Sequence, residues 1–172
     1  MTSMKLTVAA GAVALAALGW SPAAHADDQP SCTAAQIVVT ALPLRAGAGH
    51  RGVPLEFSLT PGSAPCTLTG YPGVDSSAGG PPIHAQRTLR GYLGGLPEDV
   101  DAPPTVTLAP GSPAEAIVEG VAVDADGNPC PTYTGLWVTP PDTSGTVGVP
   151  VVIDTCELQV HPVTGAVTRD EI

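Results

Sequence analysis

The chain has 172 residues, a formal net charge of -10 at pH 7, and 20 glycines and 20 prolines. Its length corresponds to one domain, at roughly 100–200 residues per domain. The glycine and proline content argues against long helices, because both residues are poor helix formers. A hydrophobic fraction of 43% excludes a typical disordered acidic chain. This composition fits short strands joined by many turns.

The first 26 residues are predicted to form a secretory signal peptide. Lys5 precedes an uncharged apolar run over 6–20, and residues 24–26 show the small-x-small pattern of a cleavage site. The run is shorter than the roughly 20 residues that span a bilayer, so an uncleaved anchor is the less favoured alternative. Residues 27–172 are expected to form a single secreted domain without stable membrane insertion. Asp27 rather than a cysteine follows the cleavage site, so no lipid anchor is expected.

Removal of this leader leaves no lysine, and five arginines against 16 acidic residues. Nucleic acid is therefore excluded as a partner, because its recognition needs a basic surface. Anionic lipid surfaces are disfavoured for the same reason. Chemistry that depends on lysine, such as Schiff-base formation, is excluded as well.

Four cysteines remain in the exported chain: Cys32, Cys66, Cys130 and Cys156. An even number in an exported protein predicts disulfides. Of the three possible connectivities we favour Cys32–Cys66 and Cys130–Cys156, since each bond then closes one contiguous segment. Each would contribute roughly 3.5–4 kcal/mol in the chain-entropy model. A four-cysteine metal site is less favoured, because zinc sites usually supply cysteines in closely spaced pairs.

Alternation of apolar and polar residues predicts about seven to nine short strands and no helical stripe. The clearest alternation runs from 55 to 60 and is typical of a half-buried antiparallel strand. Strands are expected at 37–40, 55–60, 66–69, 83–89, 105–108, 114–123, 133–139, 149–153 and 158–160, with loops at 71–82 and 91–104. Glu115 and Glu119 are expected on the solvent face of their strand. This spacing predicts an all-β sandwich.

Several sequence strings are spread over nearly the whole mature chain: Cys32, LEFSLT at 55–60, CTLTGYPGV at 66–74, VTLAPGSPA at 106–114, Cys130 and Cys156. They resemble an actinobacterial family of secreted proteins and lipoproteins known as domain of unknown function 4232. The resemblance implies an exported, immunoglobulin-like antiparallel β-sandwich and supplies no catalytic residues. Many relatives carry a lipid-attachment motif or a long linker. This chain shows neither, so we expect a free monomer.

Three aromatic residues stand out. Tyr71 is expected to anchor a corner by donating its hydroxyl to the backbone. Trp137 and Tyr133 lie in a strand where Leu136 and Val138 alternate with Trp137. If Leu136 and Val138 face the core, Trp137 and Tyr133 face outward and suit contact with a protein or a glycan. In the reverse register Trp137 belongs to the core, and the pattern alone leaves both registers open.

Asp124 and Asp126 are the best metal candidates, because alternate carboxylates suit calcium, a hard cation that takes six to eight oxygens. A hairpin turn of turn-favouring residues is the preferred interpretation, since the EF-hand spacing is not met. The histidines His50, His84 and His161 are far apart in sequence. We expect them at the surface or at edges rather than at a metal site.

No string predicts catalysis, since Gly-x-Ser-x-Gly is absent and all four cysteines are expected to be oxidised. The chain is therefore not expected to be an enzyme, and no cofactor is expected. The predicted function is a secreted, non-catalytic binding or interaction module of the cell envelope or extracellular space. Its partner would be an extracellular protein or a glycan. A calcium-stabilised structural domain and a small secreted hydrolase are the alternatives.

Overall fold

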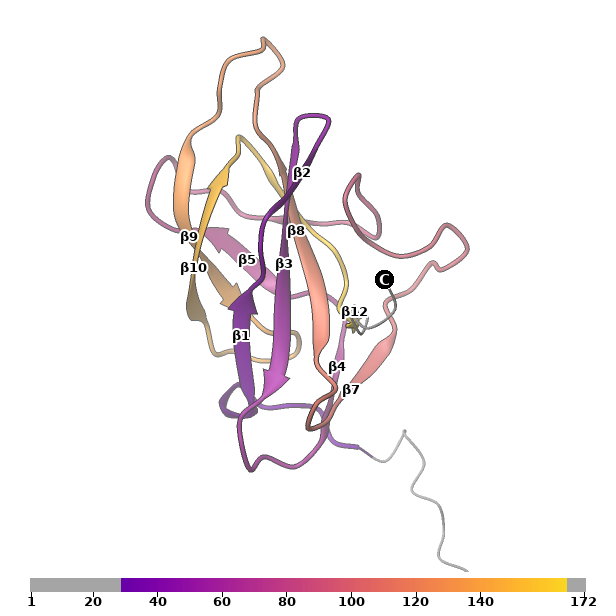
Figure 1. Ribbon diagram of the computed structural model, residues 1–172. Helices are drawn as coiled ribbons and strands as arrows, with labels where there is room; N and C mark the ends of the chain where they lie inside the picture. Colours follow the sequence, from indigo (N-terminus) through magenta and orange to yellow (C-terminus); the bar gives the residue numbers. More distant parts are fainter. Residues whose placement is uncertain (1–28, 167–172) are drawn as a thin grey trace, which may run out of the picture.

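The computed structural model describes residues 29–166, so the predicted leader lies outside the described residues (Figure 1). The fold is all-β, as predicted. Within these described residues a short 3-10 helix, η2 (Ala34–Gln36), precedes twelve strands. They are β1 (Ile37–Ala41), β2 (Arg45–Gly47), β3 (His50–Leu59), β4 (Cys66–Thr69), β5 (Gly73–Ser76), β6 (Gln86–Arg87), β7 (Thr105–Leu108), β8 (Ala114–Val121), β9 (Thr132–Thr139), β10 (Val147–Asp154), β11 (Leu158–Val160) and β12 (Thr164–Gly165).

The nine predicted strands are present, and β2, β5 and β12 are additional. Strand β5 lies inside the 71–82 segment that was expected to be a loop. Its inward positions are Val74 and Ser76, so only one of them carries an apolar side chain. Ser76 is satisfied at 7% exposure because its Oγ accepts a hydrogen bond from the N–H of Ile83. A strand that buries a serine gives no apolar alternation to detect.

The strands form three sheets. The largest has the order β1-β3-β8-β11-β6, with β2 added to β3 and β12 to β8; the others are β10-β9-β5 and β4-β7. Strands β6 and β11 pair in parallel, and the other named pairs are antiparallel. Figure 1 shows β1, β3 and β8 side by side, with β5, β9 and β10 forming the neighbouring sheet.

Buried side chains from all three sheets pack into one core. In β3 the predicted alternation is confirmed, since Leu55 and Phe57 are fully buried while Glu56 is only partly buried. The main contributors from the different sheets are Val53, Leu55, Phe57, Leu68, Leu108, Val118, Leu136, Val138 and Ile153. The result is a sandwich-like arrangement in which each sheet also keeps an outer face. Those outer faces carry the two candidate sites.

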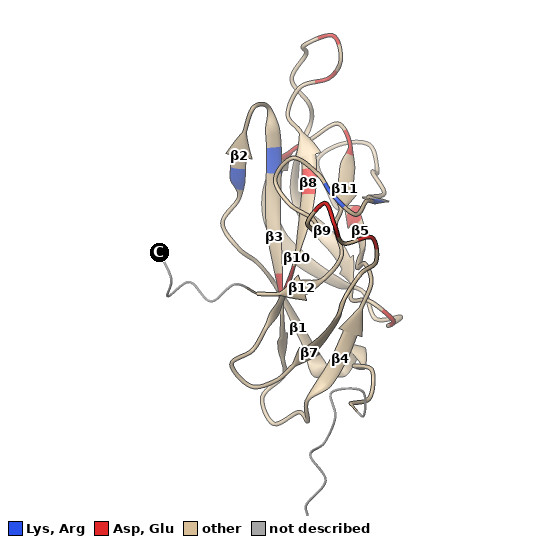
Figure 2. Cartoon of the chain, turned by 90° about the vertical axis from the view of Figure 1, so that its right-hand side faces the viewer, with Lys and Arg blue, Asp and Glu red and all other residues tan. Residues whose placement is uncertain are grey.

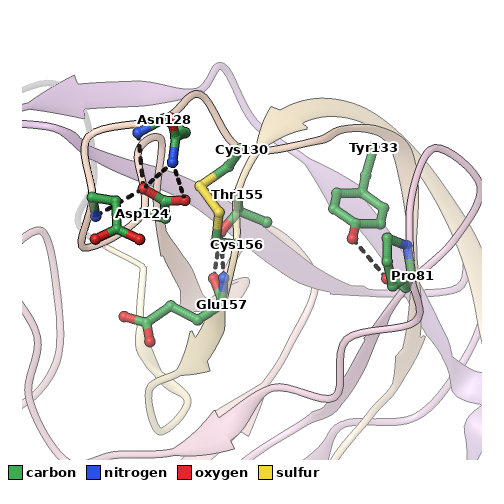
Figure 3. The surroundings of a disulfide bond; sticks show 9 residues. Pro81, Asp124, Asn128, Cys130, Tyr133, Thr155, Cys156 and Glu157 are labelled. Atoms are coloured by element: carbon green, nitrogen blue, oxygen red, sulfur yellow. Dashed lines mark hydrogen bonds between the residues drawn. A yellow bond between two sulfur atoms is a disulfide. The ribbon is translucent and has the colours of Figure 1, made fainter.

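Both disulfides join the predicted partners. Cys32–Cys66 connects the segment before η2 to the start of β4, with a Cα–Cα distance of 4.9 Å. Cys130–Cys156 connects the segment before β9 to the one after β10, with a Cα–Cα distance of 5.0 Å (Figure 3). All four cysteines are therefore oxidised.

Candidate functional site

Strand β9 places Trp137 on the outer face of the three-stranded sheet. Leu136 and Val138 are fully buried, whereas 49% of the Trp137 surface is exposed. Of the two registers that the sequence leaves open, the structure therefore adopts the one in which Trp137 faces outward. An exposed indole of this kind is the most prominent aromatic surface on this sheet.

Tyr133 does not share that face, and the outward position predicted for it is wrong. Only 1% of Tyr133 is exposed, and its hydroxyl donates a hydrogen bond of 2.6 Å to the carbonyl of Pro81 (Figure 3). The register between β9 and β10 shifts between Pro150 and Ile153, so strict alternation does not extend to Tyr133. The acceptor lies 52 residues earlier in the chain, so this bond differs from a tyrosine corner, whose acceptor lies a few residues upstream. The corner role of Tyr71 stays a prediction.

The sheet surface beside Trp137 is hollowed because two strand positions are glycine. Gly148 lies opposite Trp137, and Gly135 lies opposite Pro150. A Cβ added at Gly148 would stand 3.1 Å from Cζ3 of the indole, and one added at Gly135 would stand 3.0 Å from Oγ of Ser77. The indole therefore lies across Gly148, and Ser77 forms a wall. The hollow, of about 280 Å³, is lined among others by Ser77, Thr134, Gly135, Trp137, Gly148 and Pro150.

A carboxylate flanks the indole on its other side. Register places Asp75 of β5 directly beside Trp137. Oδ1 of Asp75 is hydrogen-bonded to Nδ1 of His84, and the two side chains are 48% and 83% exposed. The surface position expected for His84 is confirmed. The indole thus lies between a solvent-exposed Asp–His pair and a glycine-floored hollow.

The outer face of the seven-stranded sheet carries a different feature, a buried charge cluster around Glu119. Oε1 of Glu119 lies 2.7 Å from Nδ1 of His50, and Oε2 lies 3.2 Å from Nε2 of His161. The backbone N–H groups of Tyr92 and Leu93 donate to the same two oxygens, at 3.0 and 2.9 Å. Each carboxylate oxygen therefore has two partners, which compensates for burial of the charge.

Residues 88–96, here called the strap, cover Glu119 and explain why it is only 3% exposed. Glycines let the strap lie close to the sheet. A Cβ at Gly91 would clash with the Glu119 carboxylate, and a Cβ at Gly52 would stand 3.1 Å from Cδ1 of Leu93. The ring of Tyr92 stacks on His50 with 4.5 Å between centroids. The solvent exposure predicted for Glu119 is wrong because the strap covers the outer face of its strand.

The surroundings of Glu119 keep it ionised. Burial raises the pKa of this carboxyl, but hydrogen bonds from Leu93, His161 and Tyr92 outweigh burial and hold the pKa below its ordinary value of 4.5. His161 is fully buried, which corrects its predicted surface position, and its Nδ1 lies 3.1 Å from Oγ1 of Thr88 in the strap. Side chains from β3, β8 and the residue after β11, together with backbone groups of the strap, thus surround one carboxylate. These segments are far apart in the sequence, so their contacts could not be predicted from it.

This cluster is a set of hydrogen bonds rather than an open ligand site. Every buried side-chain nitrogen and oxygen among the described residues has a hydrogen-bond partner. Over residues 29–166, no group of three or more His, Cys, Asp and Glu side chains is arranged to hold a metal ion. The hydrogen bonds of this cluster therefore hold the strap against the sheet.

Asp124 and Asp126 lie in the turn between β8 and β9. Oδ1 of Asp124 accepts hydrogen bonds from the N–H groups of Asp126 and Asn128, at 2.9 and 2.8 Å, and the Asn128 amide donates to Oδ2 (Figure 3). These bonds, led by the Asn128 side chain, lower the pKa of Asp124. They favour the turn interpretation, with Gly127 in the left-handed region at φ 83°. Calcium binding here stays a prediction, checked by the melting temperature with and without a chelator.

The segment after the strap is held by Arg90. Its guanidinium donates to the carbonyls of Pro97, Glu98 and Val100 at 2.6–3.0 Å, and it lies 3.3 Å from a carboxylate oxygen of Asp101. Elsewhere the charges are sparse. Figure 2 shows acidic positions on several loops and on strands β5 and β8, and basic positions on the paired strands β2 and β3.

Together these features define an all-β domain with two disulfides. One outer face exposes Trp137, and another carries the Glu119 cluster covered by the strap. A family model described as Domain of unknown function (DUF4232) matches residues 32–165, and the chain belongs to this family. No curated protein and no solved structure matches the chain significantly. Within the described residues no helix is long and apolar enough to cross a membrane.

Proposed function

We propose that the chain is a non-catalytic binding module that acts after export, in the extracellular space or the cell envelope. The observation that carries this proposal is Trp137, half-exposed beside a hollow that glycines keep open. Tryptophan is enriched among the residues that dominate binding energy at interfaces. Its amphipathic ring supplies a large contact area, and an indole N–H can donate a hydrogen bond to a ligand.

Export is supported by the two disulfides, because such bonds form and persist in oxidising compartments. The predicted leader over residues 1–26 supports the same compartment. The secreted, actinobacterial origin implied by the family resemblance agrees with both. We propose that the mature chain is a free monomer whose partner is an extracellular protein or a glycan, rather than nucleic acid or a membrane.

The absence of catalysis in this proposal follows from where the perturbed groups lie. Catalytic sites usually gather titratable groups with shifted pKa values in a cleft. Among residues 29–166, the carboxyls with lowered pKa values are Glu119, which lies under the strap, and Asp124, which lies in a turn. Neither lines the hollow beside Trp137. This separation favours binding over the hydrolase alternative.

The test compares two exposed aromatics on different faces. A tagged chain would be expressed in its own producer and purified gently from the medium, and the bound mass would be measured by native mass spectrometry. We expect Trp137→Ala to lose the bound partner and Tyr92→Ala, which removes a 61% exposed ring from the strap, to keep it. Equal retention of the partner by both variants would overturn the proposal.

A further inference from the structure

We propose that the hollow beside Trp137 binds the ring of a neutral sugar, with the indole stacked on the C–H face of that ring. This inference rests on the binding function proposed above and names the ligand class for the same site. It follows from four properties of the site: its flat apolar surface, its polar rim, its size and its charge.

The first two properties match the two-sided chemistry of a sugar. A pyranose presents an apolar C–H face and a rim of hydroxyls, and C–H groups make favourable contacts with an aromatic face. The indole offers such a face because Gly148 beneath it carries no side chain. Ser77 Oγ supplies a polar atom in the wall of the hollow, and the Asp75 carboxylate supplies another beside the indole, outside the lining of the hollow. A charged acceptor such as Asp75 forms the stronger hydrogen bonds to hydroxyls.

The size of the hollow sets the scale of the ligand. Pockets for drug-sized molecules usually measure about 300–1,000 Å³, and this hollow measures about 280 Å³. It therefore holds one ring of a longer chain rather than a whole oligomer. This volume depends on the missing side chain at Gly135, since a Cβ there would stand 3.0 Å from Ser77 Oγ and 3.1 Å from the Val149 carbonyl and would narrow the hollow.

The charge of the chain selects a neutral sugar over an acidic one. The formal net charge is -10, and Asp75 stands beside the indole. Carboxylated or sulfated sugars would meet like charges at close range, which disfavours association. Neutral hydroxyls meet no such penalty and can donate to the Asp75 carboxylate, whose Oδ1 is also bonded to His84.

A proline-rich peptide is the competing ligand for an exposed tryptophan. Such peptides dock in grooves lined by aromatic side chains. In the described part of the β5–β9–β10 sheet, Trp137 is the one aromatic side chain on the outer face, since Tyr133 is buried in the core. A single aromatic ring beside a one-ring hollow favours the sugar.

The experiment uses the full chain with Trp20→Phe, which leaves Trp137 as the only tryptophan, so that indole fluorescence reports on this site alone. Probes are neutral hexasaccharides of glucose, mannose, galactose and xylose, an anionic hexagalacturonate and a proline-rich decapeptide, each titrated to millimolar concentration. Because the W137A variant lacks the reporter, its affinity is measured by saturation-transfer NMR of the ligand, as is that of every other variant.

We expect at least one neutral hexasaccharide to bind, with affinity reduced at least tenfold by Trp137→Ala and several-fold by Gly135→Ala, which narrows the hollow. Tyr92→Ala, the matched loss of an exposed aromatic, should leave affinity unchanged. Preference for the decapeptide or hexagalacturonate, or binding by no neutral probe, overturns the sugar assignment. The proposed binding function is tested separately. It is wrong if the Trp137→Ala variant still binds the partner found in the producer's medium.

Discussion

The two outer faces of the sandwich use the same side-chain chemistry with opposite outcomes. On the three-stranded sheet, Asp75 pairs with His84 and both remain about half-exposed or more. On the seven-stranded sheet, Glu119 pairs with His50 and His161, and its side chain is 4% exposed. In both places a carboxylate on the outward side of a strand meets histidine. The difference is the strap, which covers one pair and has no counterpart over the other.

Glycines leave space on both outer faces, and the strap fills that space on only one of them. Gly52 and Gly91 remove side chains where the strap lies on the sheet, and the space they leave is filled by Leu93 and by the cluster itself. Gly135 and Gly148 remove side chains beneath and beside Trp137, and the space there stays open. A missing side chain therefore allows either closer packing or a ligand site, depending on whether another segment of the chain reaches it.

The largest expected effect comes from loss of the buried carboxylate. Glu119→Gln replaces one acceptor oxygen with a donor that faces N–H groups, so it should lower the free energy of unfolding by about 3 kcal/mol. The matched change Asp75→Asn, on the exposed pair, should cost less than about 0.5 kcal/mol. Urea unfolding at pH 7 measures both free energies. Similar decreases for the two variants would show that the strap does not make the Glu119 pair more important for stability than the exposed Asp75 pair.

A somewhat smaller effect is expected from filling the space beneath the strap. A Cβ at Gly91 would clash with Glu119 Oε2 and stand 2.5 Å from Nε2 of His161, so Gly91→Ala should cost about 2 kcal/mol. Gly148→Ala, whose Cβ meets only the movable edge of the Trp137 ring, should cost less than about 0.5 kcal/mol. Hydrogen exchange at the amides of Tyr92 and Leu93 should quicken in the first variant alone; unchanged exchange there would contradict this account.

Acid should weaken the strapped face over a defined range. Because the folded-state pKa of Glu119 lies below its ordinary 4.5, its contribution is complete above pH 4.5 and is lost as the pH falls through the folded-state value. Melting temperatures of the parent chain and of Glu119→Gln, measured from pH 7 down to pH 3, should therefore converge in acid. Asp124 has a lowered pKa too, but it is common to both chains. If the melting temperatures of the two chains instead fell in parallel, Glu119 would not be the cause of the loss of stability in acid.

The smallest effect on stability belongs to the residue with the proposed function. Trp137 is 49% exposed, so Trp137→Ala should change the free energy of unfolding by about 0.5 kcal/mol or less. Its effect should appear in binding instead. Thermal unfolding of this variant would settle the point, and a loss above about 2 kcal/mol would indicate that the indole is a structural element of the sheet.

The sequence predicts what depends on local pattern. The fold class, the nine strands and both disulfide pairs follow from alternation and from cysteine spacing. Glu119 is placed on the correct side of its strand. The strap is missed because it has no periodicity. The contacts of His50 and His161 with Glu119 are missed because they join segments far apart in the chain. Tyr133 is misplaced because the register shift between Pro150 and Ile153 leaves no trace in residue type.

Arg90 has a consequence for survival outside the cell. Trypsin-like proteases cleave after lysine or arginine held in an extended, accessible segment. The described residues contain no lysine and only four arginines, and Arg90 is the one in the strap. Its guanidinium is engaged by the carbonyls of Pro97, Glu98 and Val100, so it is withdrawn from an approaching protease. The same contacts that shape this loop thus shield its single basic cleavage site.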